Sequence, residues 1–171
     1  GDFYKWREAA AYVYGVTKDE VLGRLIDEVI EVIGKAQRED GYLHTPVIIE
    51  QRQGIERSRE FAERMDFETY NLGHLMTTAC VHFRATGKTA LLDVARKAAD
   101  YLFGYYKTAT AELARNAICP SHYMGVVEMY RTTGDERYLE LAKNLIEIRD
   151  LFTEGGDDNQ DRVPLREQSE A

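Results

Sequence analysis

Apolar residues recur every three or four positions between Lys18 and Gln37, and charged residues fill the opposite face. This spacing is typical of an amphipathic helix, and it is the clearest one in the chain. Residues 3–14 alternate aromatic residues and alanines at near-helical spacing, which predicts a helix that ends with Gly15 as its C-cap. The same periodicity predicts four more helices, at residues 68–86, 89–107, 120–132 and 136–150.

The helical pattern breaks at Asp40-Gly41. Residues 42–49 form a short segment rich in β-branched side chains, which favours an extended loop over a helix. Residues 50–66 are strongly charged, so we expect them to form a solvated excursion. A polar loop at residues 153–162 precedes Pro164, which is well placed to start another helix.

Two of the predicted helix pairs are copies of one another, related by a shift of 47 residues. The shift places Phe83-Arg84 on Tyr130-Arg131 and Thr86-Gly87 on Thr133-Gly134. The helices within residues 3–37 would be a more diverged copy. A period of this length, built from antiparallel helix pairs, predicts stacked hairpins in an open solenoid or a closed toroid.

Polar and aromatic side chains collect at the start of the first helix of each pair. The second helices carry ordinary charged outer faces. This asymmetry favours a toroid whose inner helices open their N-terminal ends onto a shared funnel. Free N–H groups and the positive end of the helix dipole favour anionic or hydroxylated ligands there. The residues concerned are Glu68, Tyr70, Asn71 and His74 in one copy, and His122 and Tyr123 in the other.

The composition fits one helical domain. A chain of 171 residues with 44% hydrophobic content can bury one sizeable core, and 30% charged residues with three prolines favour helices over short strands. A net charge of −8 argues against nucleic acid as a partner. No apolar run approaches the roughly 20 residues of a membrane span. The chain starts without Met and ends on what looks like the opening of a helix, so we expect it to be part of a longer protein.

Several motifs occur in one order along the chain. They are the Asp40-Gly-Tyr-Leu43 loop, residues 67–76 (Phe-Glu-Thr-Tyr-Asn-Leu-Gly-His-Leu-Met), the Ala-Thr-Gly-Lys turn at 85–88, the run that starts at Tyr130-Arg131, and residues 158–168. Together they resemble the β-L-arabinofuranosidase family, glycoside hydrolase family 127. The resemblance covers nearly the whole chain.

The resemblance implies an all-α fold in which residues 1–171 are an incomplete (α/α)6 catalytic domain, a partial toroid of antiparallel helical hairpins. It implies a bacterial, exo-acting, retaining glycoside hydrolase that releases terminal L-arabinofuranose or a related pentose from plant glycans such as pectin. The compartment, periplasmic or cytoplasmic, is left open.

The resemblance also implies a zinc-bound cysteine thiolate as nucleophile and a glutamate as acid/base. Zinc suits this role because it lowers the pKa of a thiol. These residues would lie beyond Ala171, so we expect no catalytic residue and no bound zinc in this segment, and the segment alone to be inactive. We expect its partners to be a carbohydrate and the remainder of its own chain.

Five residues are candidate substrate ligands. Glu68 could accept sugar hydroxyls, or it could only complement the helix dipole. Tyr70 and His74 share a helix face at i and i+4. His44 follows a loop that would lie at the rim of a toroid. Gln168 opens the final helix, which by resemblance continues into the pocket.

Other reactive residue types are better explained by packing. Cys80 lies mid-helix among apolar residues, and Cys119 precedes a helix start, so neither is assigned as nucleophile or ligand. His82 and Trp6 are expected in the core. The acidic loop around Asp158 lacks the closing glutamate of a calcium loop.

Phe67 is a departure from the family, whose helix usually opens with His-Glu-x-Tyr and whose histidine helps to hold the sugar. The departure suggests an altered sugar pocket. Two alternatives to the arabinofuranosidase remain: a non-catalytic helical-repeat scaffold that binds protein or glycan, and another (α/α)6 sugar enzyme such as an epimerase or an unsaturated-uronide hydrolase.

Overall fold

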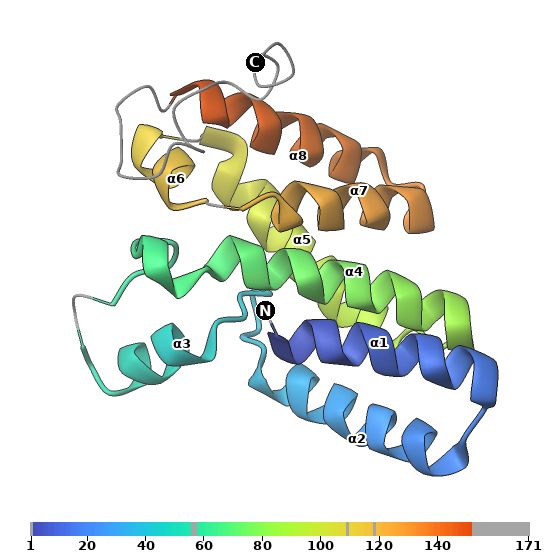
Figure 1. The fold of residues 1–171 in the computed structure, drawn as a ribbon. Coiled ribbons are helices and arrows are strands. Elements are labelled where there is room, and N and C mark those ends of the chain that lie inside the picture. The colour runs from blue at the N-terminus through green and yellow to red at the C-terminus, as the bar shows by residue number, and fades with distance from the viewer. Residues whose placement is uncertain (1, 56–57, 109, 118, 152–171) are drawn as a thin grey trace.

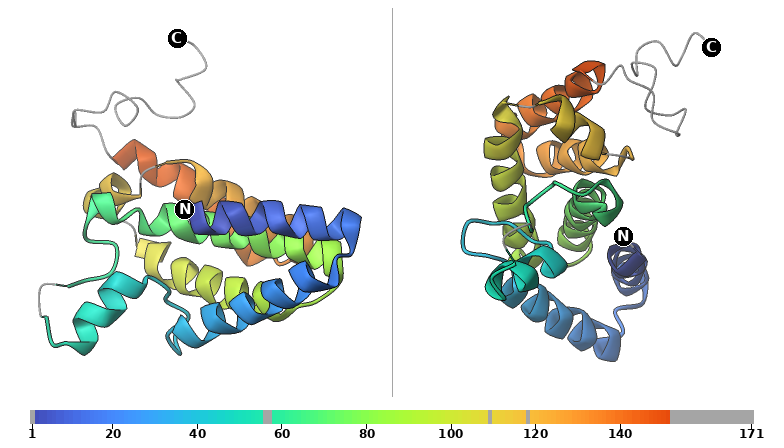
Figure 2. Two further views of the ribbon diagram at one scale, coloured as in Figure 1. Left: turned by 60° about the horizontal axis from the view of Figure 1, so that its bottom comes forward. Right: turned by 90° about the vertical axis from the view of Figure 1, so that its left-hand side faces the viewer.

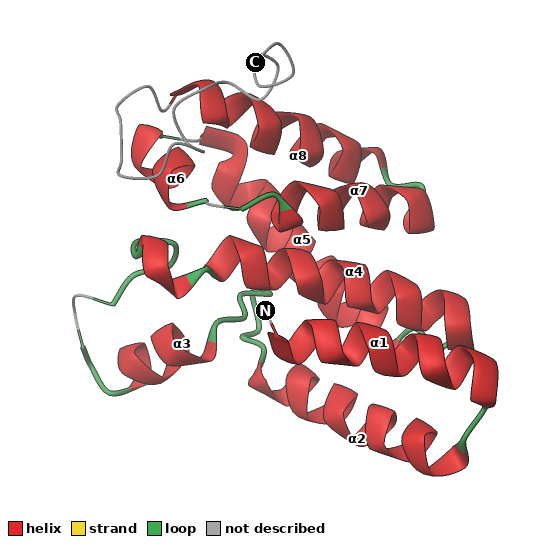
Figure 3. Cartoon of the chain, viewed as in Figure 1, coloured by secondary structure: helices red, strands yellow, loops and turns green. Residues whose placement is uncertain are grey.

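The computed structural model describes residues 2–55, 58–108, 110–117 and 119–151 (Figure 1). Helices and loops make up this part of the chain, which contains no strand (Figure 3). The α-helices are α1 (Asp2–Thr17), α2 (Glu20–Ala36), α3 (Thr45–Arg52), α4 (Glu68–Thr86), α5 (Ala90–Tyr105), α6 (Ala111–Asn116), α7 (Ser121–Thr133) and α8 (Glu136–Glu147). Short 3-10 turns are η1 (Arg64–Asp66), η2 (Tyr106–Thr108) and η3 (Ile148–Leu151).

Three antiparallel hairpins, α1–α2, α4–α5 and α7–α8, stack side by side. Helix α4 packs against α1 and α7, and α5 packs against α2 and α8. The first helices of the hairpins therefore form one layer and the second helices another. The right-hand view of Figure 2 shows that the two layers follow a curve. This arrangement confirms the predicted all-α fold of helical hairpins.

The second and third hairpins share one turn. The Thr86 hydroxyl donates to the carbonyl of His82 at 2.7 Å, and Gly87 then adopts a left-handed conformation with φ of 74°. Thr133 and Gly134 repeat this geometry in the third hairpin, with a hydrogen bond of the same length and φ of 71°. A left-handed residue ends a helix at little cost only when it is glycine. The structure thus confirms the 47-residue repeat at its turn.

The first hairpin is the diverged copy that the sequence predicted, but its turn lies further along. Helix α1 runs through Gly15, so the prediction of a C-cap there was wrong. Thr17 closes the helix by donating to the carbonyl of Val13 at 2.9 Å, as the threonines of the other turns do. Lys18 takes the left-handed position, with φ of 54°. Its Nζ donates to the carbonyl of Ala85 at 3.1 Å.

The prediction of an extended loop over residues 42–49 was also wrong at its C-terminal half, because α3 begins at Thr45. Pro46 stands in the first helical turn, where its fixed φ suits a helix and its missing N–H costs nothing. Val47 and Ile48 are buried against the rest of the core. β-Branched residues lower helix propensity only slightly, so tertiary burial overrides it here.

Residues 50–66 are not simply a solvated excursion. The Arg38 guanidinium donates to Glu60 at 2.6 Å, and Phe61 is 2% exposed. The charged residues of this segment surround one aromatic side chain that anchors it to the core. Helix α6, which the sequence pattern did not predict, lies beyond it along the chain.

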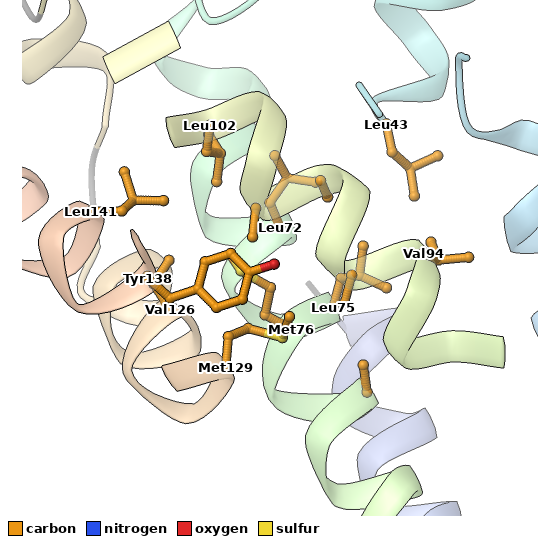
Figure 4. Close-up of a cluster of buried hydrophobic side chains, with 14 of the residues drawn as sticks. Leu43, Leu72, Leu75, Met76, Val94, Leu102, Val126, Met129, Tyr138 and Leu141 are labelled. Atoms are coloured by element: carbon orange, nitrogen blue, oxygen red, sulfur yellow. The ribbon is translucent and has the colours of Figure 1, made fainter. Parts of the chain in front are cut away.

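The core lies between the two layers. Figure 4 shows buried side chains from α4, α5, α7 and α8 meeting there. Cys80 and His82 are buried, which confirms their packing interpretation. The prediction that Trp6 lies in the core was wrong. Trp6 is 53% exposed, whereas the side chain of its neighbour Arg7 turns inward and is 2% exposed. The Arg7 guanidinium donates to the carbonyl of Ile26 at 3.0 Å and so links the helices of the first hairpin.

Helices α4 and α7 cross at two glycines. A Cβ atom on Gly73 would lie 2.2 Å from the carbonyl oxygen of Ser121, and one on Gly125 would lie 2.3 Å from the carbonyl oxygen of Gly73. Only hydrogen fits at either position. The two backbones are therefore in direct contact, and any side chain would push the helices apart.

We predict that Gly73→Ala lowers the free energy of unfolding by about 1–3 kcal/mol, because the added methyl group overlaps backbone that cannot move independently. Urea unfolding measures this change. Gly104→Ala is the matched control, since a Cβ there meets nothing within 4 Å in helix α5. The control should raise stability by about 0.5–1 kcal/mol, as alanine does in a helix. Equal effects of the two substitutions would contradict the close crossing.

Candidate functional site

A hollow of about 400 Å³ lies where the first helices of the three hairpins begin. Asp2 contributes from the start of α1, and Cys119 comes from just before α7. The remaining lining residues surround the start of α4: Asp66, Phe67, Tyr70 and Asn71. Carboxylate and amide groups next to aromatic rings are the side chains that bind a polyhydroxylated ligand, because they combine hydrogen bonding with an apolar contact surface.

Three of the lining residues follow helical spacing along α4 with His74, which does not itself line the hollow. Phe67, Tyr70, Asn71 and His74 stand at i, i+3, i+4 and i+7, which places them on one stripe of the helix. The Tyr70 ring contacts Phe67 with centroids 5.9 Å apart and His74 with centroids 4.6 Å apart. Spacing alone could therefore have added Phe67 and Asn71 to the candidate site residues.

A cation stands beside Tyr70. The Nζ of Lys5 on α1 lies 5.1 Å from the centroid of the Tyr70 ring. Burial, and secondly the charge of Lys5, lower the pKa of His74 below its ordinary value. His74 is therefore neutral at neutral pH and can both donate and accept a hydrogen bond. Its ring contacts the Tyr70 ring edge-to-face.

The short length of α7 leaves room for the hollow. Helix α4 has 19 residues, whereas α7 has 13. The 47-residue shift would place the partner of Glu68 at Arg115, but α7 begins only at Ser121. On the side of α4 that faces α7, the first turns of α4 therefore have no helix of equal length beside them. Cys119, just before α7, lines the hollow there instead.

Glu68 lies behind this wall, not in it. Its side chain is 3% exposed and accepts two hydrogen bonds, from the Tyr42 hydroxyl and from the Phe61 N–H at 2.6 Å. Burial raises the pKa of Glu68 to about 7, although both hydrogen bonds lower it. Its sugar contact stays a prediction, and its geometry favours a structural role.

His44 lines a second hollow of about 430 Å³ between α1, α2 and the start of α3. Asn71 lines both hollows, so the two are neighbours at the same end of the hairpins. Burial lowers the pKa of His44, which keeps its imidazole neutral at neutral pH. Gln168 lies outside the described residues, and its sugar contact stays a prediction.

His122 and Tyr123, at the start of α7, do not line the hollow with Tyr70. His122 is fully buried, and burial lowers its pKa to about 3. It is therefore a neutral packing group at neutral pH. Tyr123 lies instead on the groove between α1, α4 and α7.

No group of three or more His, Cys, Asp and Glu side chains within the described ranges is arranged to hold a metal ion. The donor set that zinc prefers is three or four such residues around one point. The described residues therefore offer no such donor set, and we derive no catalytic step through zinc. The helices of the described segment are all too short or too polar to cross a membrane.

Comparison with known proteins identifies the family. The catalytic domain of the β-L-arabinofuranosidases, GH127, matches residues 1–171. The chain belongs to this family. A non-reducing end β-L-arabinofuranosidase of Bifidobacterium longum subsp. longum is 33% identical over 148 residues, which are 86% of this chain and 22% of that protein. The GH127 match confirms the resemblance drawn from the motifs.

Solved structures of glycoside hydrolases share the fold. A glycoside hydrolase of 60% identity superimposes with a TM-score of 0.77 over 96% of this chain and 24% of its own. A GH127 β-L-arabinofuranosidase from Geobacillus stearothermophilus is 35% identical, with a TM-score of 0.75 over 86% of this chain and 23% of its own. The chain thus spans about a quarter of the length of these relatives.

The buried carboxyl group of Glu68 gives a prediction on pH. Its pKa rises from 4.5 to about 7 on folding, so the native state holds a proton that the unfolded state has lost between these values. The resulting stability is fully present below about pH 4.5 and is lost as the pH rises through about 7. Each unit of pKa difference corresponds to about 1.4 kcal/mol.

Glu68→Gln removes this titration. The free energy of unfolding of wild type, relative to Glu68→Gln, should fall between about pH 4.5 and about pH 7 and stay level above. Urea unfolding of both proteins across this range measures it. Glu63→Gln is the control, because Glu63 is exposed. A difference that does not vary with pH would show that Glu68 titrates normally.

Proposed function

We propose that this chain forms part of an exo-acting glycoside hydrolase that releases terminal L-arabinofuranose, or a related pentose, from plant-derived glycans. GH127 membership and the named activity of the Bifidobacterium longum relative support this proposal. The hollow at the start of α4 supplies one wall of the sugar site. Its carboxylates and Asn71 bind sugar hydroxyls, and the Phe67 and Tyr70 rings contact the C–H face of the sugar.

Further helical hairpins complete this site. The first helix of the arc, α1, exposes five large apolar side chains, each at least half exposed. An apolar face of this size normally packs against another surface. The remainder of the ring covers it and contributes the zinc-bound thiolate and the acid/base glutamate. The exposed residues are Phe3, Trp6, Tyr12, Val13 and Val16.

A non-catalytic scaffold is the alternative that needs a separate test. The clustering of hydrogen-bonding and aromatic groups in one open hollow of about 400 Å³ favours a small carbohydrate ligand over a protein partner, which would need a larger surface.

The full-length protein that we propose to contain this chain should release L-arabinose from an aryl β-L-arabinofuranoside. Tyr70→Ala should lower kcat/KM by about tenfold or more, because it removes both the apolar contact and the hydroxyl from the wall. Steady-state kinetics with purified, folded variants measure both. Glu63→Ala, on the exposed surface, is the control. Absence of any L-arabinose release would refute the function, and wild-type kinetics of Tyr70→Ala would move the sugar elsewhere.

Phe67 gives a test of sugar selectivity. Its ring offers no hydrogen bond, so wild type should lose little, less than about threefold in kcat/KM, with any monodeoxy analogue whose missing hydroxyl faces residue 67. Phe67→His introduces a polar group that one hydroxyl can satisfy. The variant should lose about tenfold with that one analogue, because the imidazole is then left unpaired. Kinetics with a series of monodeoxy aryl arabinofuranosides identify the hydroxyl that faces residue 67. If wild type and Phe67→His lose the same kcat/KM with every analogue, residue 67 lies outside the site.

A further inference from the structure

Helix α4 begins in an unusual way. Its N-cap residue, Phe67, is in the left-handed region with φ of 52° and ψ of 35°, and its side chain caps no N–H group. N-caps are usually Ser, Thr, Asp or Asn in an extended conformation, whose side chains accept a hydrogen bond. A bulky residue in the left-handed region persists only where its surroundings hold it there. The start of α4 therefore needs support from outside the helix.

Glu68, the next residue, provides this support. One carboxylate oxygen accepts from the hydroxyl of Tyr42, and the other accepts from the N–H of Phe61 at 2.6 Å. Tyr42 belongs to the loop before α3, and Phe61 belongs to the loop before η1. The first residue of α4 is thus tied to two separate segments of the chain.

Both attachment points are themselves fixed. The ring of Phe61 contacts Tyr105 with centroids 4.7 Å apart and Tyr42 with centroids 5.7 Å apart. Asn116 of α6 donates to the carbonyl of Phe61 at 3.0 Å and to the carbonyl of Ala62 at 2.7 Å. Arg38 lies over the Tyr42 ring at 4.8 Å and donates to Asp40 in the same loop. Glu68 is therefore held by parts of the fold that do not touch the hollow.

We propose that Glu68 is a positioning residue: its bonds to Tyr42 and Phe61 hold Phe67 in the left-handed conformation and so fix the Phe67–Tyr70 wall against the ligand. Glu68 lies behind this wall and does not touch the sugar. The inference rests on the proposed function only for the identity of that ligand, since the wall and its support are features of the fold.

Kinetics of three variants in the full-length protein test the role. Glu68→Ala leaves the buried Tyr42 hydroxyl and Phe61 N–H without their acceptor, and we expect KM to rise about tenfold while kcat changes less than about threefold. Glu68→Gln keeps one acceptor oxygen for the Phe61 N–H and gains an N–H group that can donate to the Tyr42 oxygen. We therefore expect this variant to have the KM of wild type. Leu145→Ala, which creates a cavity in buried α8, is the control for lost stability and should leave KM unchanged.

A second readout does not depend on activity. The ring signals of Phe67 and Tyr70 in NMR spectra of protein labelled at Phe and Tyr should shift in Glu68→Ala, return in Glu68→Gln and stay in place in Leu145→Ala. If these ring signals shift in Glu68→Ala but the wild-type full-length protein has no arabinofuranosidase activity, the positioning role is upheld and the proposed function is refuted. A folded Glu68→Ala with wild-type KM and ring signals would overturn the positioning role. If Glu68→Ala does not fold, Tyr42→Phe removes one of the two bonds, and unchanged ring signals and KM in that variant would overturn it equally.

Discussion

The contact of two backbones at Gly73 and Gly125 is the constraint on which the site depends. Because no side chain separates α4 from α7, the Ser121 hydroxyl can donate to the carbonyl of Tyr70 at 3.1 Å, and Cys119 follows into the space beside the first turns of α4. Helices usually pack 8–10 Å apart, and glycines allow the shorter approach. A wider crossing would separate the two sides of the hollow, so the geometry of the ligand wall is set by residues that never reach the ligand.

Hydrophobic periodicity predicted the long helices because each buries one face against the other layer. It could not predict α3 or α6, which are short and owe their conformation to burial and to local turns. Gly15 does not end α1, because a residue other than glycine, Lys18, takes the left-handed position. The better signal was Thr17, whose hydroxyl closes the helix in the same way as Thr86 and Thr133.

The chemical type of each residue was enough to select the candidate ligands. It could not predict which of them face the hollow. Glu68 and Tyr70 are two positions apart, which is about 200° around a helix, so both cannot face one hollow. Only the structure shows which of them turns outward. The carboxylate lies inward because two loops distant in sequence supply its hydrogen bonds, and no local pattern reveals partners of that kind. Membership of GH127 was within reach of the sequence because its motifs are distributed along the whole chain in a fixed order.

Lys18 replaces a glycine in the first turn, and it gives that turn a second task. Its Nζ binds the carbonyl of Ala85 in the next hairpin, and nearby Lys88 of the second turn forms an ion pair with Asp27 of the first hairpin at 2.5 Å. Arg84 in turn binds Glu128 of the third hairpin at 2.9 Å. In a stack of repeats, such bonds between neighbours decide whether units melt separately or together. These bonds link each hairpin to the next in addition to the packing between their helices, and so add to the interface terms that couple neighbouring units during unfolding.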